Sequence, residues 1–149
     1  MSWERLHLGC GKNHKQGYCN IDITYDADLC IDLEKNTLPM AANECTEIIA
    51  ENLLCMLGDI KNVMNECHRV LKVGGTLRLL TFDAGKYPEL MYQDPAHKRG
   101  LNRKAYDYFI DGTPEYTELG STYGYEPWSL VSAEEYGKCL LVVLTPVKR

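Results

Sequence analysis

The sequence predicts an α/β domain built on a mostly parallel, twisted sheet of about seven strands, with an antiparallel edge strand and helices on both faces. Three observations lead to this prediction. Short apolar runs alternate with helical or looping crossovers, as parallel strands require. A glycine turn follows the first run, and aspartates end the second and third. The chain has 149 residues, which suits one core and leaves no room for a separate substrate domain.

Four strands are expected in the first third of the chain. Residues 5–8 form an apolar-rich run that stops at the turn Gly9-Cys10-Gly11. Residues 21–23 and 28–32 form two more short runs, and residues 46–50 form a fourth. Little helix separates the first three, so the sheet begins with closely spaced strands.

The remaining elements include the clearest helix of the sequence. Apolar residues recur at i, i+3, i+4 and i+7 spacing over residues 59–72, which predicts an amphipathic helix with one buried face. Residues 76–82 then form a buried fifth strand, and residues 102–110 a second helix. Two last strands, around 128–131 and 139–145, form an antiparallel hairpin at the sheet edge.

Charge and hydropathy limit the partners. The formal net charge is −5 and no dense Lys/Arg block occurs, so a nucleic-acid substrate is disfavoured. The longest apolar run, residues 139–144, is far shorter than the roughly 20 residues that span a bilayer. The first residues run straight into a strand and lack the apolar stretch of a secretory signal, so we expect a cytoplasmic protein.

The seven cysteines include no C-x-x-C pair, which argues against a disulfide framework or a structural zinc site. We expect them to be small buried residues in a reducing compartment, and we expect no metal. A metal site built from Cys10, Cys19 and His14 is the alternative, although its spacing is irregular.

The turn Gly9-Cys10-Gly11 lets a ligand approach exposed backbone N–H groups. Asp22, at the end of the second strand, is placed to accept hydrogen bonds from the vicinal hydroxyls of a ribose. A dinucleotide fingerprint would have a third glycine where this chain has His14, and that glycine lets a helix approach the pyrophosphate. The pattern therefore favours a ligand with a ribose and no phosphate.

The chain resembles the class I S-adenosylmethionine-dependent methyltransferases, and the likeness covers most of residues 5–110. Within that family it is similar to the small type 11-like branch often found with glycan and lipid biosynthesis. There, a segment like Asp94-Pro95-Ala96-His97 follows the fifth strand. The other segments that carry the resemblance are Leu6–Gly11, Gly17–Ile23, Asp32-Leu33 with Leu38-Pro39, and Glu66–Gly75.

The resemblance implies a Rossmann-like fold and S-adenosyl-L-methionine as cofactor, with S-adenosyl-L-homocysteine as product. It divides the single domain 1–149 into a cofactor-binding half, 5–82, and an acceptor-side half, 83–149, made of a loop, a helix and the hairpin. The glycine turn would pass the methionine portion, Asp22 would bind the ribose, Asp32-Leu33 would flank the adenine, and Glu51-Asn52 would line the methionine end. The implied cofactor-binding residues are Leu8, Gly9, Cys10, Gly11, Asp22, Ile23, Asp32, Leu33, Glu51 and Asn52.

Methyl transfer needs alignment of acceptor, methyl and sulfur, and a base when the acceptor is a hydroxyl. His97 and Asp94 are the predicted catalytic residues, because an imidazole has a suitable pKa for a base near neutrality. Asp83, at the end of the fifth strand, and Tyr92 are predicted to contact the acceptor. A histidine in a loop that only bonds the backbone is the competing interpretation of His97.

Two departures from the family pattern bear on function. Residues 52–56 read Asn-Leu-Leu-Cys-Met where the family commonly has His-Val-Leu-Glu-His, and Val73 stands where the family usually has proline. No helix precedes the first strand in this sequence, which leaves the site open to cover by a partner or a second copy in a homodimer. The predicted function is methyl transfer to a small-molecule, lipid or glycan-type acceptor. A catalytically silent, methyltransferase-like binding protein is the first alternative, and an NAD-type nucleotide binder the second.

Overall fold

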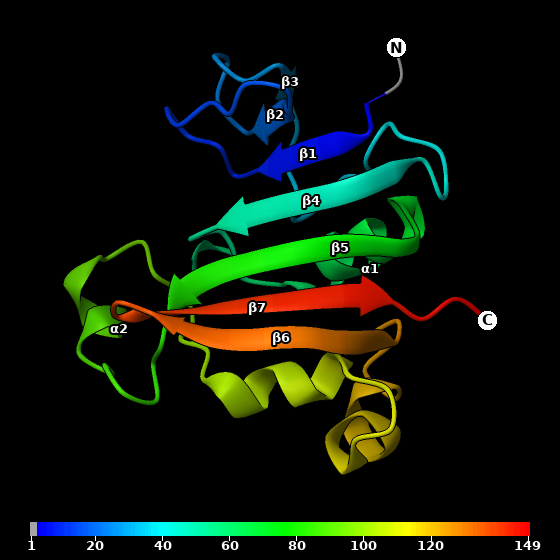
Figure 1. Cartoon of the computed structure of the whole chain (residues 1–149). Coiled ribbons are helices and arrows are strands. Elements are labelled where there is room, and N and C mark those ends of the chain that lie inside the picture. Colours follow the sequence, from blue (N-terminus) through cyan, green and yellow to red (C-terminus); the bar gives the residue numbers. More distant parts are fainter. Residues whose placement is uncertain (1–2) are drawn as a thin grey trace.

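The computed structural model describes residues 3–149 (Figure 1). It contains one sheet of seven strands in the spatial order β3-β2-β1-β4-β5-β7-β6. The five strands β1 to β5 run parallel, while β7 is antiparallel to both of its neighbours. The strands are β1 (Arg5–Leu8), β2 (Cys19–Asp22), β3 (Leu29–Cys30), β4 (Cys45–Glu51), β5 (Leu71–Phe82), β6 (Trp128–Tyr136) and β7 (Cys139–Pro146).

This arrangement confirms the predicted Rossmann-like α/β fold, including the hairpin at the edge. The antiparallel strand is β7, one position in from the edge, and β6 is the edge strand itself. The strand order reverses beside β1, where β2 and β4 flank it. In such sheets the carboxyl ends of the strands at the reversal form the ligand crevice.

The helices are fewer and shorter than the strands. Helix α1 begins two residues later and ends two residues earlier than the predicted 59–72. The second predicted helix, 102–110, is present as a 3-10 helix over residues 103–109, and a π-helical turn follows in a stretch for which no helix was predicted. The helical segments are η1 (Leu54–Met56), α1 (Lys61–Val70), α2 (Leu90–Gln93), η2 (Arg103–Phe109) and η3 (Tyr116–Gly120).

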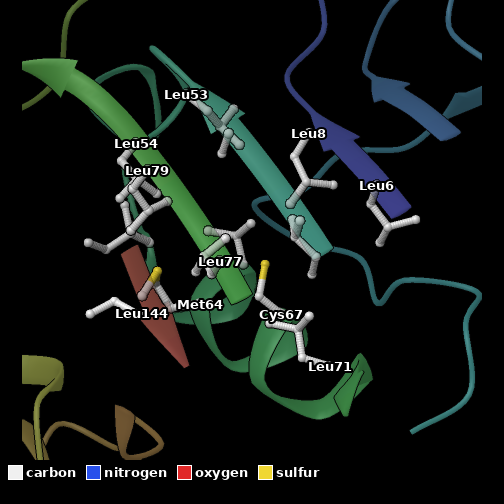
Figure 2. Packing of buried hydrophobic residues seen from close by; sticks show 14 of the residues in the cluster. Leu6, Leu8, Leu53, Leu54, Met64, Cys67, Leu71, Leu77, Leu79 and Leu144 are labelled. Atoms are coloured by element: carbon white, nitrogen blue, oxygen red, sulfur yellow. The ribbon is translucent and has the colours of Figure 1, made fainter. Parts of the chain in front are cut away.

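One face of the sheet carries the core (Figure 2). Leu6 lies opposite Ile48 in the register of β1 and β4, and Ile48 lies opposite Leu77 of β5, so their side chains share this face. They pack with Met64 and Cys67 of α1, and all five side chains are almost fully buried. Burial of this apolar face against the helix layer is the main stabilising term.

The expectation of helices on both faces is wrong for residues 3–149. Helix α1 packs on the core face, and η2 packs there too, since Tyr106 lies 3.5 Å from the hydroxyl of Thr81 on that face. The connections after β1 and β2, residues 9–18 and 23–28, contain turns, bends and irregular backbone and no helix. They are too short to carry a crossover helix to the other face.

Glu66 and Arg69 of α1 fasten the loop before β4. The carboxylate of Glu66 accepts a 2.6 Å hydrogen bond from the backbone N–H of Leu38. Arg69 donates to Glu66 and to the carbonyl oxygens of Leu38 and Met40. These bonds satisfy the polar groups of a buried turn and hold it against the helix.

All seven cysteines are free thiols. Five of them are buried, as expected, whereas Cys139 is half-buried and Cys30 is exposed at the sheet edge. Between residues 3 and 149, no helix has the length and apolar character needed to span a bilayer.

Candidate cofactor site

The glycine turn after β1 has a backbone that only glycine adopts without strain. Gly9 has φ +67°, and its N–H donates to the carbonyl of Ile21 over 2.8 Å. A Cβ at this position would lie 2.9 Å from Cδ1 of Leu53. The turn therefore needs glycine both for its conformation and for its close approach to the segment after β4.

Asp22 ends β2 with its carboxylate directed at this turn. One carboxylate oxygen accepts from the N–H of Gly11 over 2.6 Å, and the other accepts from the N–H of Ile23, also over 2.6 Å. A carboxylate has about four acceptor positions, so two remain for a ligand. The geometry is consistent with a carboxylate that both shapes the turn and receives ribose hydroxyls.

A cavity of about 480 Å³ opens at the carboxyl ends of β1, β2 and β4. Its floor is apolar and its rim carries carboxylates and one lysine, which is the composition of a small-molecule site. The lining residues are Gly9, Asp22, Ile23, Ile31, Asp32, Leu33, Glu34, Lys35, Asn52, Leu53, Met56 and Leu57.

Six of the ten predicted cofactor-binding residues line this cavity, namely Gly9, Asp22, Ile23, Asp32, Leu33 and Asn52. The side chains of Leu8 and Cys10 are buried behind the turn, and Gly11 faces Asp22 through its N–H. Glu51 instead lines a separate hollow on the other side of β4. The roles of all ten remain predictions.

Asp32 also has a local structural role. Its carboxylate accepts from the N–H of Glu34 over 3.0 Å, and its carbonyl accepts from Lys35 and Asn36, so it shapes a tight turn at the cavity rim. Asn52 has φ +55°, and its N–H donates to the carbonyl of Leu80. This left-handed residue turns the chain so that the next residues enter the cavity wall.

Glu51 belongs to a small charged cluster. Its carboxylate lies 2.8 Å from Nζ of Lys15 and 3.8 Å from Nε2 of His7. The other ring nitrogen of His7 is 3.0 Å from the side-chain oxygen of Asn20. Burial is the main cause that lowers the pKa of His7, and the hydrogen bond to Asn20 opposes it only in part.

The sequence-based prediction missed the apolar half of the cavity. Ile31, Leu53, Met56 and Leu57 line it. The signal was the departure in residues 52–56, where Cys55 and Met56 stand in place of the glutamate and the second histidine of the family pattern. The apolar residues directly after this strand can form a cavity wall against a flat ring. This interpretation is as natural as the loss of a catalytic motif.

His97, the predicted base, has both ring nitrogens near polar groups. Nδ1 lies 2.9 Å from the carbonyl of Leu90, and Nε2 lies 4.0 Å from the carboxylate of Asp94. The ring stacks on Phe82 with a centroid distance of 4.9 Å. Neither His97 nor Asp94 lines the cavity described above.

The two predicted acceptor contacts differ in environment. Asp83 is buried, and its carboxylate accepts from the N–H groups of Gly85 and Lys86, which closes the turn after β5. Tyr92 is 84% exposed on α2 and lines none of the cavities described here. The structure therefore brings the predicted cofactor residues together more closely than the predicted acceptor residues.

The alternative metal site at Cys10, Cys19 and His14 gains no support. Residues 3–149 contain no group of three or more His, Cys, Asp or Glu side chains arranged to hold an ion. Burial, the largest cause, raises the pKa of Cys19 to about 11, so the thiol is protonated at neutral pH.

Comparison with known proteins bears on the family and the fold. The family model described as a methyltransferase domain matches residues 6–79, which include β1 to β4, α1 and most of β5. Over this segment, which is just under half of the chain, the sequence matches the methyltransferase domain family, and the fold of the whole chain is that of the class I S-adenosylmethionine-dependent methyltransferases, whose cofactor is S-adenosylmethionine. No curated protein sequence matches the chain.

Solved structures share the fold at low identity. A putative methyltransferase of Haloferax volcanii, solved in complex with the Trm112 methyltransferase activator, is 13% identical with a TM-score of 0.68 over 99% of this chain and 84% of that one. The PH0226 protein of Pyrococcus horikoshii is 16% identical with a TM-score of 0.65, over 99% and 83%. A possible histamine N-methyltransferase of Thermotoga maritima is 14% identical with a TM-score of 0.62, over 97% and 82%.

Proposed function

We propose that this chain is an active S-adenosylmethionine-dependent methyltransferase whose acceptor is a small molecule, a lipid or a glycan. The observation that carries the proposal is the carboxylate of Asp22 beside Gly9 at the rim of the 480 Å³ cavity. The net charge of −5 makes a nucleic-acid acceptor unfavourable.

The cavity suits the adenosine part of this cofactor. Asp22 offers acceptors for the ribose hydroxyls, and Ile31, Leu53 and Leu57 offer apolar surface for a flat base. Gly9 keeps free the space that a side chain would fill. When bound, the cofactor supplies a methyl group on a sulfonium cation, and an acidic rim favours a cation over a phosphate.

His97 would accept the proton of a hydroxyl acceptor. If Nδ1 donates to the carbonyl of Leu90, the free lone pair lies on Nε2, beside Asp94. The loop that carries His97 is bonded to the cavity wall, because the N–H of Lys98 donates to the carbonyl of Cys55 over 2.7 Å. Asp83 and Tyr92 are the proposed acceptor contacts, and the rest of the transfer depends on alignment and exclusion of water.

Calorimetric titration with S-adenosylhomocysteine tests the cofactor half of the proposal, with NAD as the comparison ligand. We expect micromolar binding of S-adenosylhomocysteine alone. Asp22→Asn keeps an acceptor for Gly11 but removes the charge, and should weaken binding by about 1.5 to 3 kcal/mol. Asp26→Asn, a matched change at an exposed site outside the cavity, should bind as the parent does. Equal affinity of the two variants would refute the ribose role of Asp22.

Turnover separates an enzyme from a silent binding protein. The alternative draws on one observation, that His97 and Asp94 do not line the cavity. Acceptor panels of sugars, lipids and small hydroxylated molecules should yield S-adenosylhomocysteine with the parent chain and at least about a hundredfold less with His97→Ala. Cofactor binding without turnover on any panel, or full turnover by His97→Ala, would contradict the catalytic assignment.

A further inference from the structure

The face of the sheet opposite the core carries no packed helix in residues 3–149, and most of its side chains are half-buried or exposed, although His7 and Val143 on it are almost fully buried. In the register, His7, Ile49, Arg78, Val143 and Ser132 lie side by side on this face, from β1 across to β6. We call this surface the open face. Figure 1 presents the strands unobstructed from this side, with α1 behind β5. The open face consists of Arg5, His7, Glu47, Ile49, Glu51, Thr76, Arg78, Leu80, Ser132, Glu134, Tyr136, Leu141, Val143 and Thr145, with Lys15 reaching it from the loop after β1.

The centre of the open face is apolar and hollowed. Ile49, Leu80 and Leu141 come from three adjacent strands and line a hollow of about 240 Å³. Val131 and Tyr136 at the edge strand are 56% and 68% exposed. A contiguous apolar patch with a polar rim is typical of an interaction surface.

Two charged groups on this face have no partner among residues 3–149. Arg78 is half-buried between the apolar side chains, and its guanidinium makes no ion pair or hydrogen bond with a described residue. Glu134 likewise has no cation within 4.0 Å in the same part of the chain. An unpaired charge against apolar surface is stabilised if binding brings an opposite charge to it.

The charges of the open face balance, although those of the whole chain do not. Arg5, Lys15 and Arg78 oppose Glu47, Glu51 and Glu134, so this face is neutral while the chain carries −5. Two copies repel each other least through a neutral face. In a two-fold symmetric dimer the same surface of each copy faces the other. Ion pairs across such a contact therefore require both positive and negative groups on that one surface.

The area is sufficient for a weak dimer. Five strands at about 4.8 Å spacing, with the four residues of β1 and about six residues of each of the other four at about 3.3 Å, give a footprint of about 20 by 20 Å. Because side chains make the accessible surface larger than the flat footprint, the area buried is roughly 600 Å² per copy, at the lower end of specific interfaces. Face-to-face packing of two sheets is a common arrangement.

We propose that a second copy of this chain covers the open face, giving a homodimer with two sheets packed face to face. Arg78 of each copy then meets an acidic residue of the other, and Leu80 and Leu141 are removed from water. The proposal is independent of the methyltransferase activity. A helix of another protein on this face, or pairing of the β6 edges, is the competing arrangement.

Size-exclusion chromatography with light scattering from about 1 to 200 µM tests the proposal, a range that covers micromolar dissociation constants. We expect the mass to rise toward twice the chain mass of 16.9 kDa. Arg78→Glu and Leu141→Arg should weaken the dimer by about tenfold or more. Lys61→Glu is a matched charge reversal on α1, which packs on the other face of the sheet, and it should leave dimer formation unchanged.

Hydroxyl-radical footprinting of the unaltered chain serves if a variant fails to fold. Oxidation of Tyr136 should fall about threefold or more as concentration rises through the dimer transition, because a buried ring loses access to solvent. Tyr25, 96% exposed and off this face, should be oxidised equally throughout. A monomer at every concentration, a dimer that survives both open-face variants, or unchanged oxidation of Tyr136 would each overturn the proposal.

Discussion

The carboxylate of Asp22 accepts a 2.6 Å hydrogen bond from the backbone N–H of Gly11, which ties the end of β2 to the turn after β1. The same carboxylate lines the cavity. Its loss therefore alters the shape of the turn and the contacts of a ligand together, and a stability measurement is needed to separate the two effects.

Asp22→Ala should lower the free energy of unfolding by about 1 to 3 kcal/mol, since two backbone N–H groups lose a charged acceptor. Asp22→Asn should lose less, because the amide oxygen still accepts from one of them. Urea unfolding monitored by circular dichroism measures both. Equal losses for the two variants would mean that the charge, and not the acceptor geometry, holds the turn.

Gly9→Ala should be more destabilising than a glycine replacement of similar backbone geometry. Gly9 has φ +67° and Gly137 has φ +61°, so each alanine pays a left-handed penalty of about 1 to 2 kcal/mol. Only at Gly9 does the new Cβ meet another group, Cδ1 of Leu53 at 2.9 Å, whereas nothing lies within 4 Å at Gly137. We expect Gly9→Ala alone to lose S-adenosylhomocysteine binding.

Calorimetry and urea unfolding of both alanine variants check this prediction. Equal stability loss would show that the contact with Leu53 relaxes freely. Retained binding by Gly9→Ala would show that the turn does not shape the cavity, which contradicts the site proposed here.

The fold was predictable from sequence because local patterns define it. The apolar run of residues 5–8 became β1, and the period of residues 59–72 became α1 with slightly shorter bounds. Gly9 and Asp22 could be predicted to lie at one site because a glycine turn and a strand-end carboxylate are both recognisable in the sequence, and both line the same cavity. Both come together at the reversal of strand order, as the topology requires.

The parts that sequence missed depend on long-range packing. Glu51 and Asn52 are adjacent and were assigned together, yet Glu51 lines a different hollow from Asn52, because side chains alternate along a strand and Asn52 turns the chain. The open face was missed although the strands predicted at 5–8, 21–23 and 28–32 already left little room for crossover helices between them. His97 looked available in sequence, and only the structure shows the carbonyl of Leu90 at its Nδ1.

Glu66→Gln should lower the free energy of unfolding at pH 7 by about 1 to 3 kcal/mol, because it weakens the charged bonds that fasten the turn at Leu38. Burial opposes ionisation of Glu66, but the bonds from Arg69 and from the N–H of Leu38 outweigh it and hold its pKa below the usual 4.5. Since the folded pKa is the lower one, this stability is complete above about pH 4.5 and is lost as the pH falls through the folded value.

The parent and Glu66→Gln should therefore converge in stability as the pH is lowered below 4.5. Urea unfolding at about pH 7 and at about pH 3.5 measures the difference at each end of this window. Glu118→Gln, at an exposed position of η3, is the control and should match the parent at both. A difference that stays constant with pH would show that the Glu66 carboxylate contributes by shape alone.

Alkylation with iodoacetamide should label one thiol of the native chain quickly, that of Cys30, because it is the exposed cysteine. Burial raises the pKa of Cys19 and of Cys45 to about 11, so at about pH 8 only about a thousandth of each is thiolate. Cys139 is half-buried and its pKa is raised by burial, so it should follow slowly. Mass spectrometry of the labelled peptides gives the order of labelling, and all seven thiols should react in urea.

Two serine variants are the controls. Cys30→Ser should abolish the fast label, whereas Cys139→Ser should keep it. Fast labelling of Cys19 in the native chain would mean that β2 separates readily from the sheet, because this thiol lies in the core with no exposed surface.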